Sequence, residues 1–326
     1  MSVGEALSET NKKALNIPRG RLNKYDLNIH CCNKSQNTFI QIITMHKTQF
    51  SGHCRYIVTD VDGTFISSDR QLIKENLDAI RQAREAGIKF AFATGRYWRS
   101  MHPLAARLGL RAPQIHDNGA TLFDQFNEKV LDCVRIPENT VRFFYNGLRA
   151  EGFTPTLCTP LDYFYAPPAG ETVQGLIDHD EFPIEMKSDD VLLDTLATEA
   201  VKVAAFSTSD IPHLEKTLAD LTREASSLGM RFNTVFTEPG IAAVNMENVN
   251  KLTGVDMACK LMGISREDVA AIGDGDNDVD MIEGCGIGIA VANAAARAKS
   301  AASHIVGTND ECGFAQAIRM ILEGKL

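Results

Sequence analysis

The 326-residue sequence predicts an α/β protein in which a parallel β-sheet with flanking helices is interrupted by an α+β insertion. Three observations lead to this prediction. Short apolar, β-rich runs alternate with helical apolar spacing over residues 55–135, and the same alternation returns over residues 243–326. Between them, residues 136–242 carry scattered prolines and aromatic clusters. We therefore expect a core domain in two parts, an inserted domain, and a flexible extension over residues 1–54.

The first core part reads as strand, helix, strand, helix, strand. The expected elements are a strand at 56–59, a helix from Leu72 to Ala83, a strand at 88–93, a helix from Trp98 to Leu108 and a strand at 113–116. Gly87 is expected to end the first helix. Strands that alternate with helices in this way are parallel and are joined by right-handed crossovers.

The second core part repeats the pattern. We expect a helix from Leu252 to Met262, strands at 269–272, 286–291 and 304–306, a helix near 294–301 between the last two strands, and a closing helix. The two parts together provide one parallel sheet.

Composition excludes several function classes. Hydrophobic residues make up 44% and charged residues 23%, which is typical of a soluble globular chain. The net charge of −9 and the lack of basic runs argue against a nucleic-acid partner. No stretch approaches the roughly 18 apolar residues of a membrane span. A small anionic substrate remains compatible with this charge when a metal ion supplies local positive charge. The sequence leaves the oligomeric state undetermined.

Eight cysteines without a C-x-x-C pair indicate reduced thiols, so we expect a cytoplasmic protein. The extension over residues 1–54 has seven basic and three acidic residues, which leaves organelle targeting as an alternative. Sparse arginine and the acidic residues Glu5, Glu9 and Asp26 argue against a transit peptide.

The segment Asp60–Thr64, Asp-Val-Asp-Gly-Thr, directly follows the first expected strand. Residues two apart on a strand face the same side, so Asp60 and Asp62 point to one place at the strand's carboxyl end, where open α/β sheets bind ligands. Two close carboxylates repel each other unless a hard cation such as Mg²⁺ lies beside them. One aspartate can then act as a nucleophile and the other as an acid and base. The alternative is an ordinary Asp-Gly turn.

A second acidic segment begins at Asp274, after another expected strand, with aspartates at alternate positions. The pattern suggests a calcium loop, but Val279 and Cys285 occupy positions where that loop needs Gly and Glu. We interpret the segment as the other half of one metal site, with Asp274 as a ligand and Asn277 or Asp278 as its support.

Two further segments are weaker signals taken alone. Thr94 and Gly95 end the second expected strand, where a hydroxyl and backbone N–H groups can hold phosphate oxygens. Lys251 opens the helix after the insertion and can offset negative charge. A simple turn and a solvated surface lysine are the alternatives.

The order of these segments resembles the haloacid dehalogenase superfamily of phosphohydrolases, and more narrowly its Cof-type branch, subfamily IIB. The segments Asp117–Ala120, Ile289–Ala294 and Asn309–Gly313 support the resemblance, which covers about residues 56–326. It implies a Rossmann-like, doubly wound parallel-sheet core with a cap domain of the C2B type inserted at 136–242. The sequence departs from the family pattern at Leu252, where a Gly is common, and this change is expected to affect the helix start.

The resemblance also implies residue roles. Asp60 would attack phosphorus to form an aspartyl-phosphate, and Asp62 would protonate the leaving oxygen and then activate water. The implied Mg²⁺ ligands are Asp60, the backbone carbonyl of Asp62, and Asp274. The implied phosphate-binding residues are Thr94, Gly95, Lys251 and Asn277, and the supporting residues are Asp278 and Asn118.

The sequence therefore predicts a Mg²⁺-dependent phosphomonoesterase acting on a small phosphorylated metabolite, with a sugar phosphate as the expected substrate. A sugar-phosphate mutase using the same nucleophile is one alternative. A non-catalytic metal- or phosphate-binding module is another, although such a module would have no physical reason to keep like charges crowded together.

Overall fold

The structure is a computed structural model that describes residues 54–168, 173, 174, 177, 184–238 and 240–326. All of them belong to the unit Lys47–Leu326. The expected extension lies outside the described residues except for Cys54, which is buried. Among the described helices, none combines the length and apolar character needed to cross a membrane.

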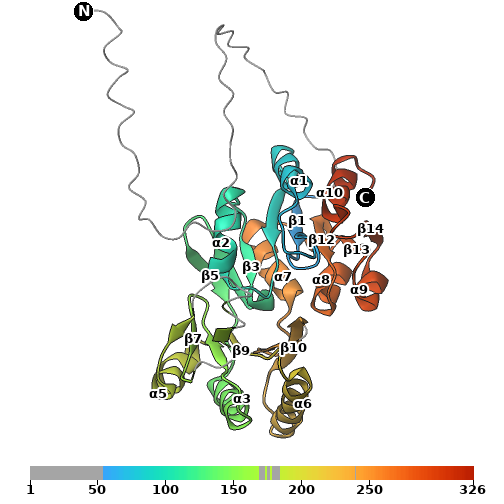
Figure 1. Ribbon diagram of the computed structural model, residues 1–326. Coiled ribbons are helices and arrows are strands. Elements are labelled where there is room, and N and C mark those ends of the chain that lie inside the picture. The colour runs from blue at the N-terminus through green and yellow to red at the C-terminus, as the bar shows by residue number, and fades with distance from the viewer. Residues whose placement is uncertain (1–53, 169–172, 175–176, 178–183, 239) are drawn as a thin grey trace, which may run out of the picture. The chain divides into compact units, whose positions relative to one another are not determined.

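The core sheet has five parallel strands in the order β14-β13-β12-β1-β2 (Figure 1). Their bounds are β1 Tyr56–Thr59, β2 Lys89–Phe92, β12 Val269–Gly273, β13 Ile287–Val291 and β14 His304–Val306. The two parts predicted from sequence thus meet in one sheet, because β1 pairs with β2 on one side and with β12 on the other.

Helices cover both faces of this sheet. They are α1 Lys74–Glu85, α2 Trp98–Arg107, α7 Lys251–Met262, α8 Val279–Gly284, α9 Ala296–Ala301 and α10 Gly313–Leu322. Residues alternate along β1: Ile57 packs with α1 and α10, whereas Tyr56 and Val58 pack with α7 and α8. Side chains of a strand point alternately to its two faces, so a fully buried strand of this kind is apolar throughout. The predicted doubly wound α/β core is confirmed.

A small antiparallel sheet extends the core. It contains β3 Gln114–His116, β4 Thr121–Asp124 and β5 Lys129–Cys133. A parallel bridge from Ala93 to Ile115 places β3 beside β2. The third strand was predicted from sequence, whereas the β4–β5 hairpin was not.

The insertion forms a six-stranded sheet in the order β10-β11-β9-β6-β7-β8. The bounds are β6 Thr156–Cys158, β7 Tyr163–Tyr165, β8 Glu185–Met186, β9 Lys202–Phe206, β10 Asn233–Glu238 and β11 Ile241–Asn245. Helices α3 Glu138–Ala150 and α6 Ile211–Ser227 pack on one face of it, and the short α5 Asp189–Val191 lies between β8 and β9 in the chain. The boundary predicted at residue 242 falls inside β11. We call this α+β region the cap.

Candidate active site

Two strand ends bring the predicted acidic segments together. β1 and β12 are adjacent and parallel, with Thr59 opposite Ile272, and the N–H of Asp60 donates to the carbonyl of Ile272 at 2.9 Å. The residues that follow each strand, Asp60 and Asp274, are therefore neighbours at the carboxyl edge of the sheet. This is the edge where the sequence places the site.

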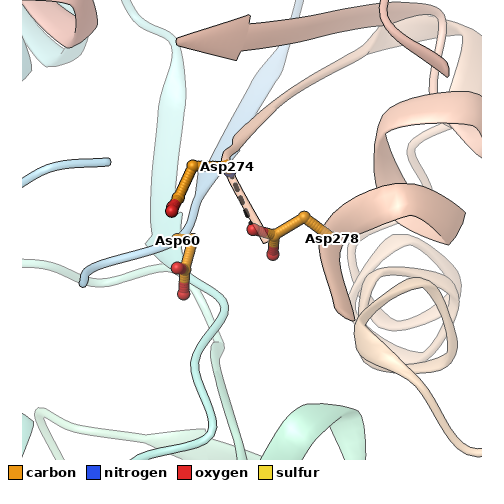
Figure 2. A group of neighbouring side chains, drawn as sticks. All are labelled: Asp60, Asp274 and Asp278. Atoms are coloured by element: carbon orange, nitrogen blue, oxygen red, sulfur yellow. Dashed lines mark hydrogen bonds between the residues drawn. The ribbon is translucent and has the colours of Figure 1, made fainter. Parts of the chain in front are cut away.

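Three carboxylates converge there (Figure 2). One oxygen from each of Asp60, Asp274 and Asp278 lies within 4.8 Å of the others. The Asp278 oxygens already have protein donors: Oδ2 accepts from the N–H groups of Asp274 and Gly275 at 2.9 and 2.8 Å. Asp60 and Asp274 are thus better placed as metal ligands, and Asp278 braces the loop that carries Asp274. Oxygen donors of this kind suit a hard divalent cation.

Lys251 connects the cluster to helix α7. Its Nζ donates to Asp60 Oδ1 and to Asp278 Oδ1, each at 2.6 Å, and the side chain is only 1% exposed. The helix begins at Lys251 because the Asn250 side chain caps it, accepting from the N–H of Thr253 at 3.0 Å. One positive charge thus offsets two buried negative charges.

Burial and mutual repulsion perturb these groups. Burial raises the pKa of Asp60 well above its usual value, and the neighbouring Asp278 and Asp274 raise it further although Lys251 opposes them. Burial, followed by Asp278, raises the pKa of Asp274 to about 6. Burial alone would lower the pKa of Lys251, but Asp278 and Asp60 outweigh it and the pKa is raised. The excess negative charge is what a bound cation would neutralise.

Gly63 and Thr64 shape the surroundings of the Asp274 carboxylate. Thr64 Oγ1 donates to Asp274 Oδ1 at 2.5 Å. Gly63 has a φ of +74°, and a Cβ at this position would lie 2.4 Å from Asp274 Oδ2. The Asp-Gly-Thr segment therefore needs glycine both for its backbone conformation and for the close approach of the Asp274 carboxylate.

Asp62 points toward a different partner. Arg96 donates to both of its carboxylate oxygens in a two-pronged ion pair. The same arginine's N–H donates to Thr94 Oγ1 at 3.1 Å, so one residue connects the predicted acid–base group to the predicted phosphate-binding turn.

Asn118 and Asn277 lie next to each other: Asn277 Nδ2 donates to Asn118 Oδ1 at 3.3 Å. Asn118 adopts a φ of +57°, and its Nδ2 is buried with no hydrogen-bond partner among the described residues. An unsatisfied buried donor of this kind indicates a missing acceptor.

These groups surround a cavity of about 540 Å³ between core and cap. The sequence-predicted residues that line it are Asp60, Asp62, Thr94, Gly95, Asn118, Asp274 and Asn277. Lys251 and Asp278 do not line it; they lie buried behind Asp60. The cap closes the cavity with Tyr163, Lys202, Ala204, Ile241 and Ala243.

Lys202 forms polar contacts between the cap and the core. Its Nζ lies 3.0 Å from Asp117 Oδ1 and donates to the Gly95 carbonyl at 2.9 Å and to the Tyr163 hydroxyl at 2.5 Å. The Tyr163 hydroxyl in turn donates to Asp117 Oδ1. The cap therefore contacts the very turn that carries Thr94.

A family model described as haloacid dehalogenase-like hydrolase matches residues 57–318, which is most of the chain. The chain belongs to the haloacid dehalogenase-like hydrolases. The family predicted from the sequence is thereby confirmed, and with it the prediction of an enzyme of the phosphatase class.

Two relatives that match this chain over most of their length are named as phosphatases. Pyridoxal phosphate phosphatase YbhA of Escherichia coli (strain K12) is 27% identical over 270 residues, covering 81% of this chain and 97% of the relative. The 5-amino-6-(5-phospho-D-ribitylamino)uracil phosphatase YcsE of Bacillus subtilis (strain 168) is 25% identical over 267 residues, covering 81% and 94%. A solved haloacid dehalogenase-like hydrolase from Bacteroides thetaiotaomicron has a TM-score of 0.72 at 25% identity, covering 82% and 99%.

The departure from the family pattern at Leu252 leaves the helix start intact. The Asn250 and Thr253 side chains form a capping box around it. The larger side chain is accommodated because α8 has Gly284 opposite it: a Cβ on Gly284 would lie 2.5 Å from Leu252 Cδ2.

Sequence reasoning missed four residues at this hydrolase site. Arg96 directly follows the predicted Thr94–Gly95 turn but received no role, and Asp117 lay in a segment used only for the resemblance. Lys202 and Tyr163 lie in cap strands whose local sequence carries no signal for a site. Only the tertiary placement of the cap over the core reveals them.

Proposed function

We propose that the chain is a Mg²⁺-dependent phosphomonoesterase that acts on a small phosphorylated metabolite through an aspartyl-phosphate on Asp60. The observation that carries the proposal is the environment of Asp60. This residue is only 8% exposed and lies at the wall of the cavity, where Lys251 holds one carboxylate oxygen and Asp274 lies beside it. A buried carboxylate fixed in this way is oriented to attack a bound phosphorus atom.

Mg²⁺ fits the residues present. Asp60 and Asp274 supply hard oxygen donors, and the resemblance adds the backbone carbonyl of Asp62. When bound, the ion would neutralise carboxylate and phosphoryl charge. Lys251 and Thr64 would keep the two carboxylates in place through the hydrogen bonds that they already make.

The reaction divides into two displacements. An Asp60 oxygen forms a bond to phosphorus while the ester P–O bond breaks, and the leaving oxygen takes a proton from Asp62. Asp62 then takes a proton from water, whose oxygen attacks the same phosphorus and releases inorganic phosphate and Asp60. Splitting the reaction matters because phosphate monoesters hydrolyse extremely slowly without a catalyst.

Phosphoryl oxygens would be held by donors that already surround the cavity. Thr94 and Gly95 lie at the end of β2, and Asn277 lies across from them. The unpartnered Nδ2 of Asn118 gives this residue a more direct role than the supporting one expected from sequence. Lys251 would act through Asp60 in this arrangement, because its Nζ is buried behind that carboxylate.

The relatives support a small metabolite: one is named for pyridoxal phosphate and another for 5-amino-6-(5-phospho-D-ribitylamino)uracil. A sugar phosphate, expected from the sequence, stays a prediction. The mutase alternative differs in product, since it would return an isomerised phosphate ester instead of inorganic phosphate.

The test is phosphate release from a panel of phosphomonoesters, with Mg²⁺ or with a chelator, by the intact chain and by Asp60→Asn. We expect release to require Mg²⁺ and to vanish in the variant. The control is Asp256→Asn, an equal change at an exposed position on α7, which should release phosphate normally. When the reaction with a phosphate-labelled substrate is quenched with acid, the intact chain should retain covalently bound label and Asp60→Asn should not. Activity that survives in Asp60→Asn would contradict the proposal, and isomerised product would favour the mutase.

A further inference from the structure

The cap side of the cavity is lined by three apolar side chains, Ala204, Ile241 and Ala243, which are 3%, 7% and 2% exposed. We propose that the substrate carries its phosphate next to a planar, largely apolar ring, such as a substituted heteroaromatic ring, and not on a polyhydroxylated sugar. The inference rests on the proposed phosphatase function, because it concerns the leaving group at the same site. It is an alternative to the sugar phosphate that the sequence led us to expect.

The three side chains come from two neighbouring antiparallel strands, β9 and β11. Ala204 pairs directly with Ala243 in their register, so the two methyl groups lie side by side on one face, and Ile241 continues that face along β11. The intervening residues Ala205 and Ala242 point to the other face, where they pack with α3 and α6. Two alanines opposite each other leave a shallow, even wall.

An aromatic cluster stiffens one end of this wall. Tyr163 stacks on Tyr97 with ring centroids 4.3 Å apart and an interplanar angle of 30°. Both rings pack in the same buried cluster as Ala204 and Ile241. The wall is therefore held at a fixed position above the core and does not depend on a loop.

The polar groups that the cap brings to the cavity are already engaged. The three N–H bonds of Lys202 have three acceptors, on Asp117, Gly95 and Tyr163. The Tyr163 hydroxyl both accepts from Lys202 and donates to Asp117. Among the described cap residues that line the cavity, the remaining side chains, those of Ala204, Ile241 and Ala243, have no polar atom.

This wall discriminates between leaving groups by desolvation. A sugar that lies against it loses water from its hydroxyls and gains no hydrogen bond from the cap in return. A planar ring loses little hydration there and makes dispersion contacts with the apolar atoms that line the cavity. Polar substituents at the ring edge could meet the core side of the cavity, whose polar lining includes Ser67, Ser68, Arg70, Asn293, Asn309 and Asp310.

The test compares pyridoxal 5′-phosphate and benzyl phosphate with glucose 6-phosphate. All three carry the phosphate on a CH₂ group attached to a six-membered ring, so they differ chiefly in ring planarity and hydroxyl content. We expect kcat/KM for both planar substrates to exceed that for glucose 6-phosphate by at least about 10-fold. Benzyl phosphate has a planar ring without the substituents of pyridoxal, so it shows whether ring planarity alone is sufficient.

Substitutions at Ala243 test whether the preference for planar substrates depends on the cap. Ala243→Asn places an amide on the apolar wall and should lower kcat/KM for the planar substrates about 10-fold or more, while the value for glucose 6-phosphate stays or rises. The control is Val235→Asn, since Val235 pairs with Ala243 on the same sheet face but does not line the cavity. Because Ala243 is 2% exposed and a larger side chain could impair folding, Ala243→Ser serves as a milder second variant.

Binding distinguishes failure of this inference from failure of the proposed function. Calorimetry on Asp60→Asn with Mg²⁺ should show tighter binding of pyridoxal 5′-phosphate than of glucose 6-phosphate. If kcat/KM for glucose 6-phosphate equals or exceeds that for the planar substrates, the ring inference is overturned and the phosphatase proposal stands. Preferential binding of planar ligands without phosphate release by the intact chain would overturn the phosphatase proposal and support the ring inference.

Discussion

Arg96 donates from Nε to Asp62 Oδ2 at 2.7 Å and from an Nη to Asp62 Oδ1 at 2.5 Å. This parallel geometry is the strong form of an arginine–carboxylate pair, and it is made with the ionised acid. Protonation of a leaving oxygen needs the protonated acid. In the proposed reaction Asp62 supplies this proton, so we expect the ion pair to rearrange when substrate binds and Arg96 to act as a positioning residue for Asp62.

We expect Arg96→Ala to lower kcat/KM for an alkyl phosphate by about 10- to 100-fold, because Asp62 loses its fixed orientation. The loss should be smaller for 4-nitrophenyl phosphate, whose leaving group needs no proton. The comparison is made by steady-state kinetics on both substrates, with Arg107→Ala on the exposed end of α2 as the control.

A double variant tests whether the two residues act together. If Arg96 works through Asp62, adding Arg96→Ala to Asp62→Asn should cost little more than Asp62→Asn alone. Additive losses, or equal losses on the two substrates, would show that Arg96 has a separate role.

Lys251→Met should destabilise the metal-free protein by about 3–5 kcal/mol, because it leaves the carboxylates of Asp60 and Asp278 buried without their cation. Urea denaturation measures the change. Lys260→Met, in the last turn of the same helix but exposed, is the matched control. Adding Mg²⁺ should reduce the difference in free energy of unfolding between Lys251→Met and the intact chain. A difference that does not change would argue against a cation at this cluster.

Metal affinity should depend on pH. The pKa of Asp274 is raised to about 6 and that of Asp60 is raised as well, so the folded protein holds these protons more tightly than the unfolded chain does. The metal-free protein therefore loses stability as pH rises from about 4 to about 6, where Asp274 ionises. Below pH 6 protons compete with Mg²⁺, and the apparent affinity should fall about 10-fold per pH unit for each proton displaced.

Calorimetric Mg²⁺ titrations between pH 5 and pH 8 check this expectation. Thermal unfolding adds an independent measurement, since Mg²⁺ should raise the Tm more at pH 8 than at pH 5. A Mg²⁺ affinity that does not change between pH 5 and pH 8 would mean that the carboxylate ligands ionise outside this pH range.

Gly63→Ala should weaken Mg²⁺ binding at least about 10-fold, because the added Cβ would displace the Asp274 carboxylate. Gly87→Ala is a close control: Gly87 has a φ of +89°, and a Cβ there meets nothing within 4 Å. Both changes place a side chain in left-handed backbone and should cost roughly 1–2 kcal/mol of stability. A similar loss of metal affinity in both would show that backbone strain, not the clash, is responsible.

The sequence predicted the parts of the site that local patterns encode. Asp60 and Asp274 each follow an apolar run that could only be a buried strand, and parallel pairing then places the strand ends together. The pairing of Arg96 with Asp62 was not predictable, because it depends on the angle at which α2 leaves β2. The same holds for Lys202, whose partners Asp117 and Gly95 lie on the core.

Fold prediction failed at a local hairpin and at the end of the insertion. The loop at residues 125–128, between β4 and β5, contains no Asn-Gly or Asp-Gly pair, so the β4–β5 hairpin lacks the usual short-range signal. Residues 241–245 join the cap sheet only because β11 pairs with β9 and β10, which is why the boundary expected at 242 falls inside a strand.

The position of β1 in the core sheet has a consequence for biosynthesis. Its neighbour β12 and the charge partner Lys251 follow about 200 residues later; Asp60 and Lys251 are 191 positions apart. At a synthesis rate of about 5–20 residues per second, the ribosome needs roughly 10–40 s to deliver that lysine after the nucleophile. A chain that ends after β11 but before β12 would contain every described cap strand and lack Asp274. We therefore expect such a chain to be inactive.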